Sequence, residues 1–159
     1  MSEPVFLAKV LTVSDGVIAG TREDTSGVAL VETLIAHGAE VVEHRVCSDG
    51  EEVVAHALID LSRDFNGVIV TTGGTGFAPR DQTPEGTRSV IEREAPGLAE
   101  AMRLVNPLGR LSRGVAGTRG QAIIVNAPGS PRGCVEQLLA VIDVLPHAVA
   151  LLADQPTRH

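Results

Sequence analysis

Short apolar runs alternate along this chain with longer segments in which apolar residues recur every three or four positions. The short runs predict β-strands at residues 6–13, 40–46, 67–72 and 121–125. Each run leads into a polar stretch that contains glycine, so each predicted strand ends in a loop. Residues 108–119, rich in Gly and Arg, are left without a predicted element.

The first two segments of helical periodicity carry recognisable end signals. One helix is predicted to begin within residues 24–27 and to end at Gly38, since glycine tolerates the left-handed conformation common at helix C-termini. Ser48 and Glu51 match a capping box, which predicts the start of the second helix.

Further helices are predicted over residues 84–93, 98–105 and 131–145. Thr83 and Ser130 each precede a proline, so each is predicted to cap a helix whose first residue is that proline. The last of these helices has a strong apolar face.

Strands that alternate with helices through mostly short connections predict a three-layer α/β/α sandwich with a mainly parallel sheet. The 159 residues show no internal repeat or linker, so residues 1–159 are predicted to form a single domain. Ligands of such sheets bind at the carboxyl ends of the strands. Loops containing residues 14–15, Asp49, residues 73–81 and residues 126–130 should therefore meet at one edge.

The composition narrows the range of partners. The net charge is −7, there is no run of basic residues, and the aromatic residues are three Phe, with no Trp or Tyr. Nucleic-acid binding normally needs Lys and Arg to neutralise phosphates and aromatic rings to stack on bases, so no nucleic-acid partner is predicted. The longest apolar tract, residues 134–153, is interrupted by Glu136, Asp143 and Pro146, so no membrane span is predicted either.

The start of the chain and its cysteines predict a cytoplasmic location. No charged segment followed by an apolar one opens the sequence, which argues against secretion. Cys47 and Cys134 lack the spacing of a zinc site and are predicted to be buried, reduced thiols.

A glycine-rich loop, Gly73-Gly74-Thr75-Gly76, lies between a predicted strand and a predicted helix start. Backbone N–H groups and a helix N-terminus arranged in this way can surround a phosphate, and glycine lets a ligand approach the backbone closely. A plain tight turn would contain the same glycines. The neighbouring charges of Arg80 and Asp81, which a plain turn does not need, favour a binding site.

Asp49 and Asp81 are the candidate functional acids, because each follows a predicted strand. Near phosphates, a carboxylate can ligate Mg²⁺ or accept hydrogen bonds from N–H donors of a substrate. Each also has a structural explanation, since Asp49 suits a helix N-terminus and Asp81 could orient a turn. Ser112 could reach a phosphate or simply be solvated. No Gly-x-Ser-x-Gly elbow or Gly-Lys-Ser phosphate loop occurs, so the residues predict a phosphate-bearing ligand without naming a reaction.

Four motifs in order along the chain resemble the molybdenum-cofactor biosynthesis family of MogA, MoaB and the G domains of gephyrin-like proteins. They are Thr12-Val13-Ser14-Asp15; Thr71-Thr72-Gly73-Gly74-Thr75-Gly76 with Arg80-Asp81 and Thr83-Pro84-Glu85; Leu111-Ser112-Arg113; and Asn126-Ala127-Pro128-Gly129-Ser130-Pro131. The resemblance covers nearly the whole chain. Gln82 and Ala127 depart from the family's usual residues, which bears on the shape of the adenine-side pocket.

The resemblance implies a molybdopterin adenylyltransferase, which transfers AMP from ATP to the phosphate of molybdopterin and releases pyrophosphate. By position, Asp49, Asp81 and Ser112 match the family's catalytic residues. The implied molybdopterin-binding residues are Ser14, Asp15, Thr72, Gly73, Gly74, Thr75, Gly76 and Arg80. The implied nucleotide-binding residues are Asn126, Ala127, Pro128, Gly129 and Ser130. One aspartate is expected to bind Mg²⁺ and the other the pterin, and the sequence does not decide which.

The resemblance also implies a homotrimer. The metal-inserting domain of fused relatives is absent from the sequence, so hand-over of the product to a separate metal-inserting protein is expected. Two alternatives stay open, a molybdopterin carrier without transferase activity and a nucleotide-binding regulatory domain. Retention of Asp49, Asp81 and Ser112 argues against both.

Overall fold

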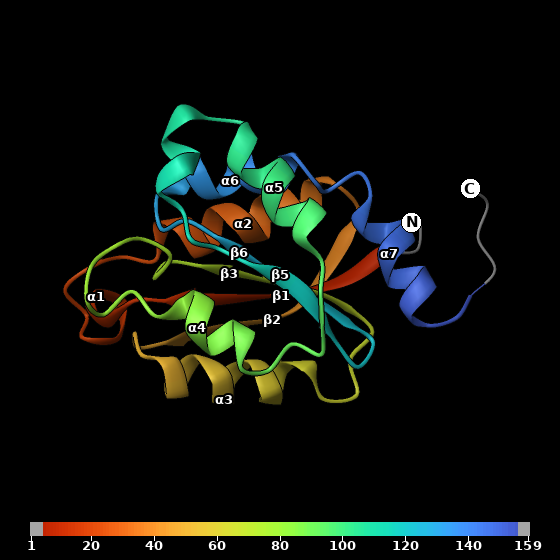
Figure 1. The fold of residues 1–159 in the computed structure, drawn as a ribbon, viewed down its shortest axis with the longest axis horizontal. Helices are drawn as coiled ribbons and strands as arrows, with labels where there is room; N and C mark the ends of the chain where they lie inside the picture. Colours follow the sequence, from red (N-terminus) through yellow and green to blue (C-terminus); the bar gives the residue numbers. More distant parts are fainter. Residues whose placement is uncertain (1–4, 156–159) are drawn as a thin grey trace.

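The computed structural model describes residues 5–155, which form a six-stranded sheet between two layers of helices (Figure 1). The strands are β1 (Phe6–Val13), β2 (Ala39–Cys47), β3 (Gly67–Thr72), β4 (Arg93–Glu94), β5 (Ala116–Arg119) and β6 (Ala122–Ala127). Their spatial order is β2-β1-β3-β6-β5-β4. The first three and β6 are parallel, whereas β5 runs antiparallel to β6 and β4 antiparallel to β5. The predicted α/β/α fold with a mainly parallel sheet is confirmed.

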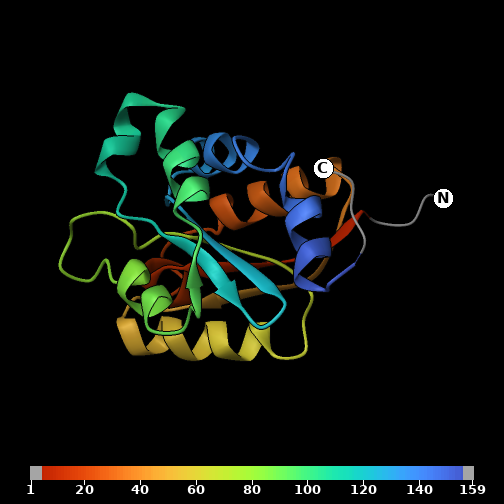
Figure 2. The ribbon, with the colours of Figure 1, turned by 45° about the vertical axis from the view of Figure 1, so that its right-hand side comes forward.

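Helices cover both faces of this sheet (Figures 1 and 2). They are α1 (Asp15–Ile18), α2 (Thr25–Ala36), α3 (Glu51–Ser62), α4 (Thr83–Arg88), α5 (Pro96–Leu104), the 3₁₀ helix η1 (Pro107–Leu111), α6 (Pro131–Leu139) and α7 (Leu145–Leu152). One face is covered by α2, α5, α6 and α7, and the other by α3 and α4. No helix within residues 5–155 combines the length and the apolarity needed to cross a membrane.

The central strands are buried on both faces, and this explains their nearly continuous apolar runs. Every residue of β3 and β6 is buried. Val68 lies in one hydrophobic cluster with Leu30 of α2, and Ile69 lies in another with Leu58 of α3. Because these strands are packed into both hydrophobic clusters, the ends of the strands, where the loops begin, are held in place.

Two helix starts differ from the prediction. The capping box predicted at residues 48–51 does not form, because Gly50 is the N-cap of α3 and provides no side chain. The N–H of Glu51 instead donates to Gln82 Oε1 at 2.9 Å. Thr83 is the first residue of α4 rather than its cap, and its hydroxyl donates to a carbonyl of the glycine loop. At α3 a contact with another loop thus replaces the local cap, whereas the start of α4 has no side-chain cap.

Several helix boundaries were also predicted wrongly. α4 ends at Arg88, and the chain then enters β4, whereas the prediction continued the helix to about residue 93. Pro96 begins α5 instead of interrupting a helix, since the first turn does not need its missing N–H. The helix predicted over residues 131–145 ends early, at Leu139, and a further helix that was not predicted, α7, begins at Leu145 with Pro146 in its first turn. Residues 108–119, left unassigned, contain most of η1 and all of β5.

Other local predictions are confirmed. Ser130 caps α6, with its Oγ accepting from the N–H of Gly133 at 2.9 Å. Gly38 follows α2 with a φ of +91°. Cys47 and Cys134 are buried, and burial raises the pKa of each thiol to about 11.

Candidate active site

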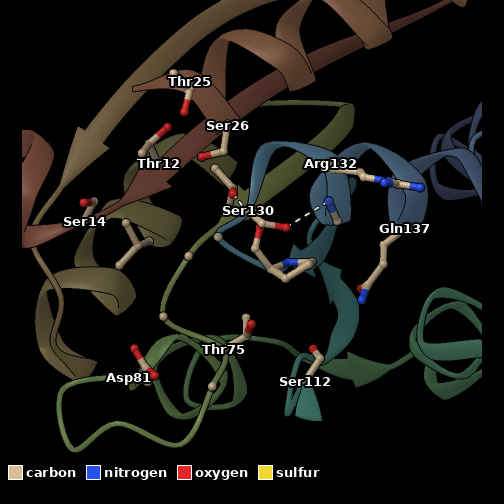
Figure 3. Close-up of a pocket in the computed structure, with 18 of the residues that line it drawn as sticks. Thr12, Ser14, Thr25, Ser26, Thr75, Asp81, Ser112, Ser130, Arg132 and Gln137 are labelled. Carbon is tan, nitrogen blue, oxygen red and sulfur yellow. Dashed lines mark hydrogen bonds between the residues drawn. The ribbon is translucent and has the colours of Figure 1, made fainter. Parts of the chain in front are cut away.

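A cavity of about 690 Å³ opens at the carboxyl ends of β1, β3 and β6. Its lining comes from the loop after β1, the start of α2, the glycine loop after β3, the end of η1 and the start of α6 (Figure 3). Parallel strands bring their carboxyl ends to one edge, so these distant segments of sequence meet there.

Most of the predicted site residues line this cavity. They are Ser14, Asp49, Thr72, Gly73, Gly74, Thr75, Gly76, Asp81, Ser112, Pro128, Gly129 and Ser130. Asp15, Arg80, Asn126 and Ala127 do not line it. The structure thus brings the three candidate catalytic residues to one cavity and leaves four predicted binding residues outside its lining.

The glycines of the loop after β3 are required by the backbone itself. Gly73 and Gly74 have φ values of +99° and +69°, which disfavour other residues. A Cβ at Gly73 would collide with the carbonyl of Val13, and one at Gly74 with the hydroxyl of Thr83. Thr83 fastens the loop, donating from its N–H to the carbonyl of Gly74 at 3.0 Å and from its hydroxyl to that of Gly73 at 2.9 Å.

Asp49 is held by reciprocal hydrogen bonds with Asp15. The N–H of Asp15 donates to Asp49 Oδ2 at 3.0 Å, and the N–H of Asp49 donates to Asp15 Oδ1 at 3.1 Å. Burial raises the pKa of the Asp49 carboxyl, and the Asp15 and Asp81 carboxylates also raise it, against a lowering by the Asp15 N–H and by Arg80. Asp49 Oδ1 faces the glycine loop, where a Cβ at Gly74 would lie 3.2 Å away.

Asp81 lies at the end of the glycine loop and is fixed from two directions. Its Oδ2 accepts from the N–H of Ala78 at 3.0 Å, and its carbonyl accepts from Arg113 Nη2 at 2.6 Å. The same guanidinium donates to the carbonyl of Gly76 and to Glu85 Oε2, each at 2.7 Å. Arg113 lowers the pKa of Glu85. Arg113 therefore anchors the loop, and Glu85 offsets its charge.

Asn126 serves the interior of the fold. Its Oδ1 accepts from the N–H of Val115 at 3.1 Å, and its Nδ2 donates to the hydroxyls of Thr71 and Thr87 at 3.0 Å each. Ala127 is fully buried, and its carbonyl accepts from an N–H of the glycine loop. Contacts from this loop to a nucleotide would therefore come from the residues that follow Ala127, which do line the cavity.

Ser112 and Thr75 form the side of the cavity opposite Ser130 and Arg132 (Figure 3). The N–H of Arg113 donates to the carbonyl of Thr75 at 2.9 Å, which places Ser112 next to the glycine loop. Ser112 Oγ accepts from the N–H of Gly114 at 3.2 Å, and a hydroxyl in this position can still donate its proton to a ligand.

Polar residues around the starts of α2 and α6 were not predicted from the sequence. The cavity is also lined by Thr12, Arg22, Glu23, Thr25, Ser26, Asn106, Arg132, Glu136 and Gln137. Arg132 pairs with Glu136 at 2.9 Å, whereas Arg22 forms no ion pair with any of residues 5–155. Both helices follow strands that were predicted to end at this edge, so the order of elements was the signal that could have located these residues.

Known protein sequences that are similar to this chain belong to molybdopterin-related proteins. The sequence model of a family described as "Probable molybdopterin binding domain" matches residues 9–147. A molybdopterin adenylyltransferase of Helicobacter pylori strain J99 is 37% identical over 150 residues, which cover 90% of this chain and 85% of that protein. The molybdopterin adenylyltransferase of Escherichia coli K12 is 36% identical over 141 residues, which cover 84% of this chain and 72% of that protein.

Solved structures of similar proteins share the whole fold. The molybdopterin biosynthesis enzyme MoaB from Thermus thermophilus is 45% identical, with a TM-score of 0.88 over 96% of this chain and 99% of that one. A structure of MogA is 39% identical, with a TM-score of 0.86 over 92% of this chain and 99% of that one. The motifs, the cavity they form and these similarities together show that the chain belongs to the MogA/MoaB family of molybdopterin-binding proteins.

Proposed function

We propose that this protein is a molybdopterin adenylyltransferase, which transfers AMP from ATP to the phosphate of molybdopterin and releases pyrophosphate. The observation that carries the proposal is the meeting of Asp49, Asp81, Ser112 and the glycine loop in one cavity. Relatives of that activity, 37% and 36% identical to this chain, support it.

The proposed reaction asks the protein to align phosphates rather than to supply a nucleophile. A phosphate oxygen of molybdopterin attacks the α-phosphorus of ATP, and the bond from that phosphorus to the pyrophosphate oxygen breaks. The attacking phosphate is already ionised at neutral pH, so no side chain has to remove a proton. Catalysis then depends on orientation and on donors that offset negative charge.

The cavity offers several such donors. The N–H of Gly73 already donates to the carbonyl of Ala127, so the candidate phosphate donors of this loop are the N–H groups of residues 74–76. The Ser112 hydroxyl and the guanidinium of Arg22 line the same cavity. Arg80 and Arg113 are bound to Asp15 and to Glu85, which leaves less of their charge for a ligand.

Either Asp49 or Asp81 would hold Mg²⁺, and the other would accept hydrogen bonds from the pterin. Within residues 5–155, no group of three or more His, Cys, Asp or Glu side chains could hold a metal ion by itself. Mg²⁺ usually keeps waters and is bound through one or two carboxylates together with substrate phosphates, so a single aspartate of the cavity fits an ion that arrives with the nucleotide. When bound, Mg²⁺ would offset the charge of the transferring phosphates.

Magnesium removal tests the proposal. Purified protein with molybdopterin, ATP and Mg²⁺ should release pyrophosphate. EDTA should stop the release because uncompensated phosphates would face two carboxylates, and added Mg²⁺ should restore it. Molybdopterin, with one phosphate and many amide donors around it, should stay bound in EDTA. Absence of pyrophosphate with every divalent cation would favour the carrier, and turnover that survives EDTA would remove Mg²⁺ from the aspartates.

Assembly and location belong to the same proposal. A homotrimer, a cytoplasmic location and delivery of the product to a metal-inserting protein are expected from the family resemblance. Sedimentation equilibrium of the purified chain would test the trimer through its mass.

A further inference from the structure

Asp15, the first residue of α1, meets Asp49 and Arg80, which lie in the loops that follow β2 and β3, beside the cavity. Arg80 donates from Nε to Asp15 Oδ2 at 2.6 Å and from Nη2 to Asp15 Oδ1 at 3.0 Å. The same Nη2 donates to the carbonyl of Asp49 at 3.1 Å. Asp15 and Asp49 also exchange two N–H to carboxylate bonds. Each of the three residues therefore contacts the other two.

Only one member of this cluster reaches the cavity. Asp49 is part of the lining, whereas Asp15 and Arg80 are not. The guanidinium fork of Arg80 is directed at Asp15 and at the backbone of Asp49. Within the described residues, their contacts with Asp49 link these two residues to the cavity.

The cluster decides how the Asp49 carboxylate is presented. One oxygen, Oδ2, accepts from the N–H of Asp15, and this leaves Oδ1 toward Gly74 and the glycine loop. Asp81 and the substrate phosphates carry the same sign of charge and would push an unrestrained carboxylate away. Arg80 opposes that displacement, because it binds both Asp15 and the carbonyl of Asp49.

Stability gives little reason for this arrangement. The side chains of Arg80 and Asp15 are 65% and 45% exposed, and exposed ion pairs contribute little to folding. We infer that Asp15 and Arg80 form a latch that positions the Asp49 carboxylate for catalysis and that neither residue binds substrate. The inference rests on the proposed AMP transfer, and it replaces the molybdopterin-binding role expected for both residues from the family resemblance.

The test compares Arg80→Gln, Asp15→Asn and the double variant with Arg88→Gln. Arg88 is the matched control, because it forms an equally exposed ion pair with Glu94 at 2.7 Å outside the cavity lining. Pyrophosphate release with molybdopterin, ATP and Mg²⁺ gives kcat and both KM values. Arg80→Gln and Asp15→Asn should each lower kcat by about tenfold or more, with KM changed by less than about twofold. The double variant should be no slower than the slower single variant, because both changes break one link.

Two kinetic outcomes would contradict the proposal that Asp15 and Arg80 position Asp49. A raised KM with unchanged kcat in Arg80→Gln would mean that Arg80 contacts substrate. Losses that multiply in the double variant would mean that the two residues act independently. Arg88→Gln should match the wild type in kcat, and all variants should melt near the wild-type temperature.

Amide hydrogen exchange gives a readout that does not depend on turnover. The N–H groups of Asp15 and Asp49 should exchange faster in Arg80→Gln than in the wild type, and Arg88→Gln should leave them unchanged. Unchanged exchange in Arg80→Gln would overturn the latch even if the enzyme is active. If the wild type releases no pyrophosphate, the proposed function fails, and the exchange rates alone decide whether Arg80 holds Asp49.

Discussion

The junctions after β3 and after β6 look alike in sequence and are used differently. Both pass from a buried strand through glycine to a residue that precedes proline, Thr83 in one and Ser130 in the other. After β6, Ser130 caps its own helix. After β3, the helix start has no side-chain cap, and the loop is held by the distant Arg113 and by the hydroxyl of Thr83 at the start of α4.

The polar residues of the two junctions have correspondingly different roles. The amide oxygen and the amide nitrogen of Asn126 both bind buried partners. Asn126 therefore links β6 to β3 and to α4 inside the fold. Asp81 keeps its carboxylate at the cavity while its carbonyl is anchored. The loop after β3 can therefore present a carboxylate to a ligand. In the loop after β6, Asn126 is used inside the fold, and residues 128–130 form part of the cavity lining.

Replacing Asp81 with Ala should have the largest effect on activity. We expect AMP transfer to fall by about a hundredfold or more, the size of loss seen when a charge-stabilising group is removed from an active site. The free energy of unfolding should change by about 1 kcal/mol or less, because the carboxylate accepts only one exposed N–H bond, from Ala78. Pyrophosphate release and urea unfolding would be measured together. Transfer near the wild-type rate in folded protein would remove Asp81 from the mechanism.

Replacing Asn126 with Ala should instead act on stability. Its buried amide makes three hydrogen bonds, and their loss leaves polar partners unsatisfied. We expect the free energy of unfolding to fall by about 2–4 kcal/mol in urea titrations. The protein that remains folded should keep its KM for ATP. Unchanged stability with a raised KM for ATP would assign Asn126 to the nucleotide after all.

Paired glycine substitutions give the smallest effects. Gly74→Ala places a Cβ on a residue with a φ of +69° and against Thr83, and should cost about 1–3 kcal/mol and weaken molybdopterin binding. Gly129→Ala meets only an ordinary contact, 3.5 Å from the Cα of Gly73, and should change stability by less than about 0.5 kcal/mol. Melting curves and molybdopterin titrations would compare the two. Equal effects at both sites would show that the loops are not used differently.

Local patterns predicted the central strands β3 and β6 because those strands are buried on both faces and consist mainly of apolar residues. The same patterns located the acids and the glycine loop, since parallel strands bring their ends together. The pattern at the start of α3 gave a wrong prediction, because a distant side chain accepts the hydrogen bond that a local cap was expected to accept. Gln82 takes the place of the predicted cap at residues 48–51.

The direction in which each predicted site residue points could not be predicted from the sequence. Arg80 and Asp81 are adjacent, yet one points to Asp15 and the other lines the cavity. Asn126 and Ser130 share a motif, yet only Ser130 lines the cavity. Such differences depend on partners that lie tens of residues away, as Asp15 does from Arg80, and no local spacing encodes them.

The central claim is that AMP is joined to molybdopterin in this cavity, and a label on the α-phosphate of ATP tests it most directly. With molybdopterin and Mg²⁺, the label should appear on molybdopterin, one for each pyrophosphate released, and Asp81→Ala should lower the transfer by about a hundredfold or more. Label that stays in ATP, or that appears only as free AMP, would contradict the claim.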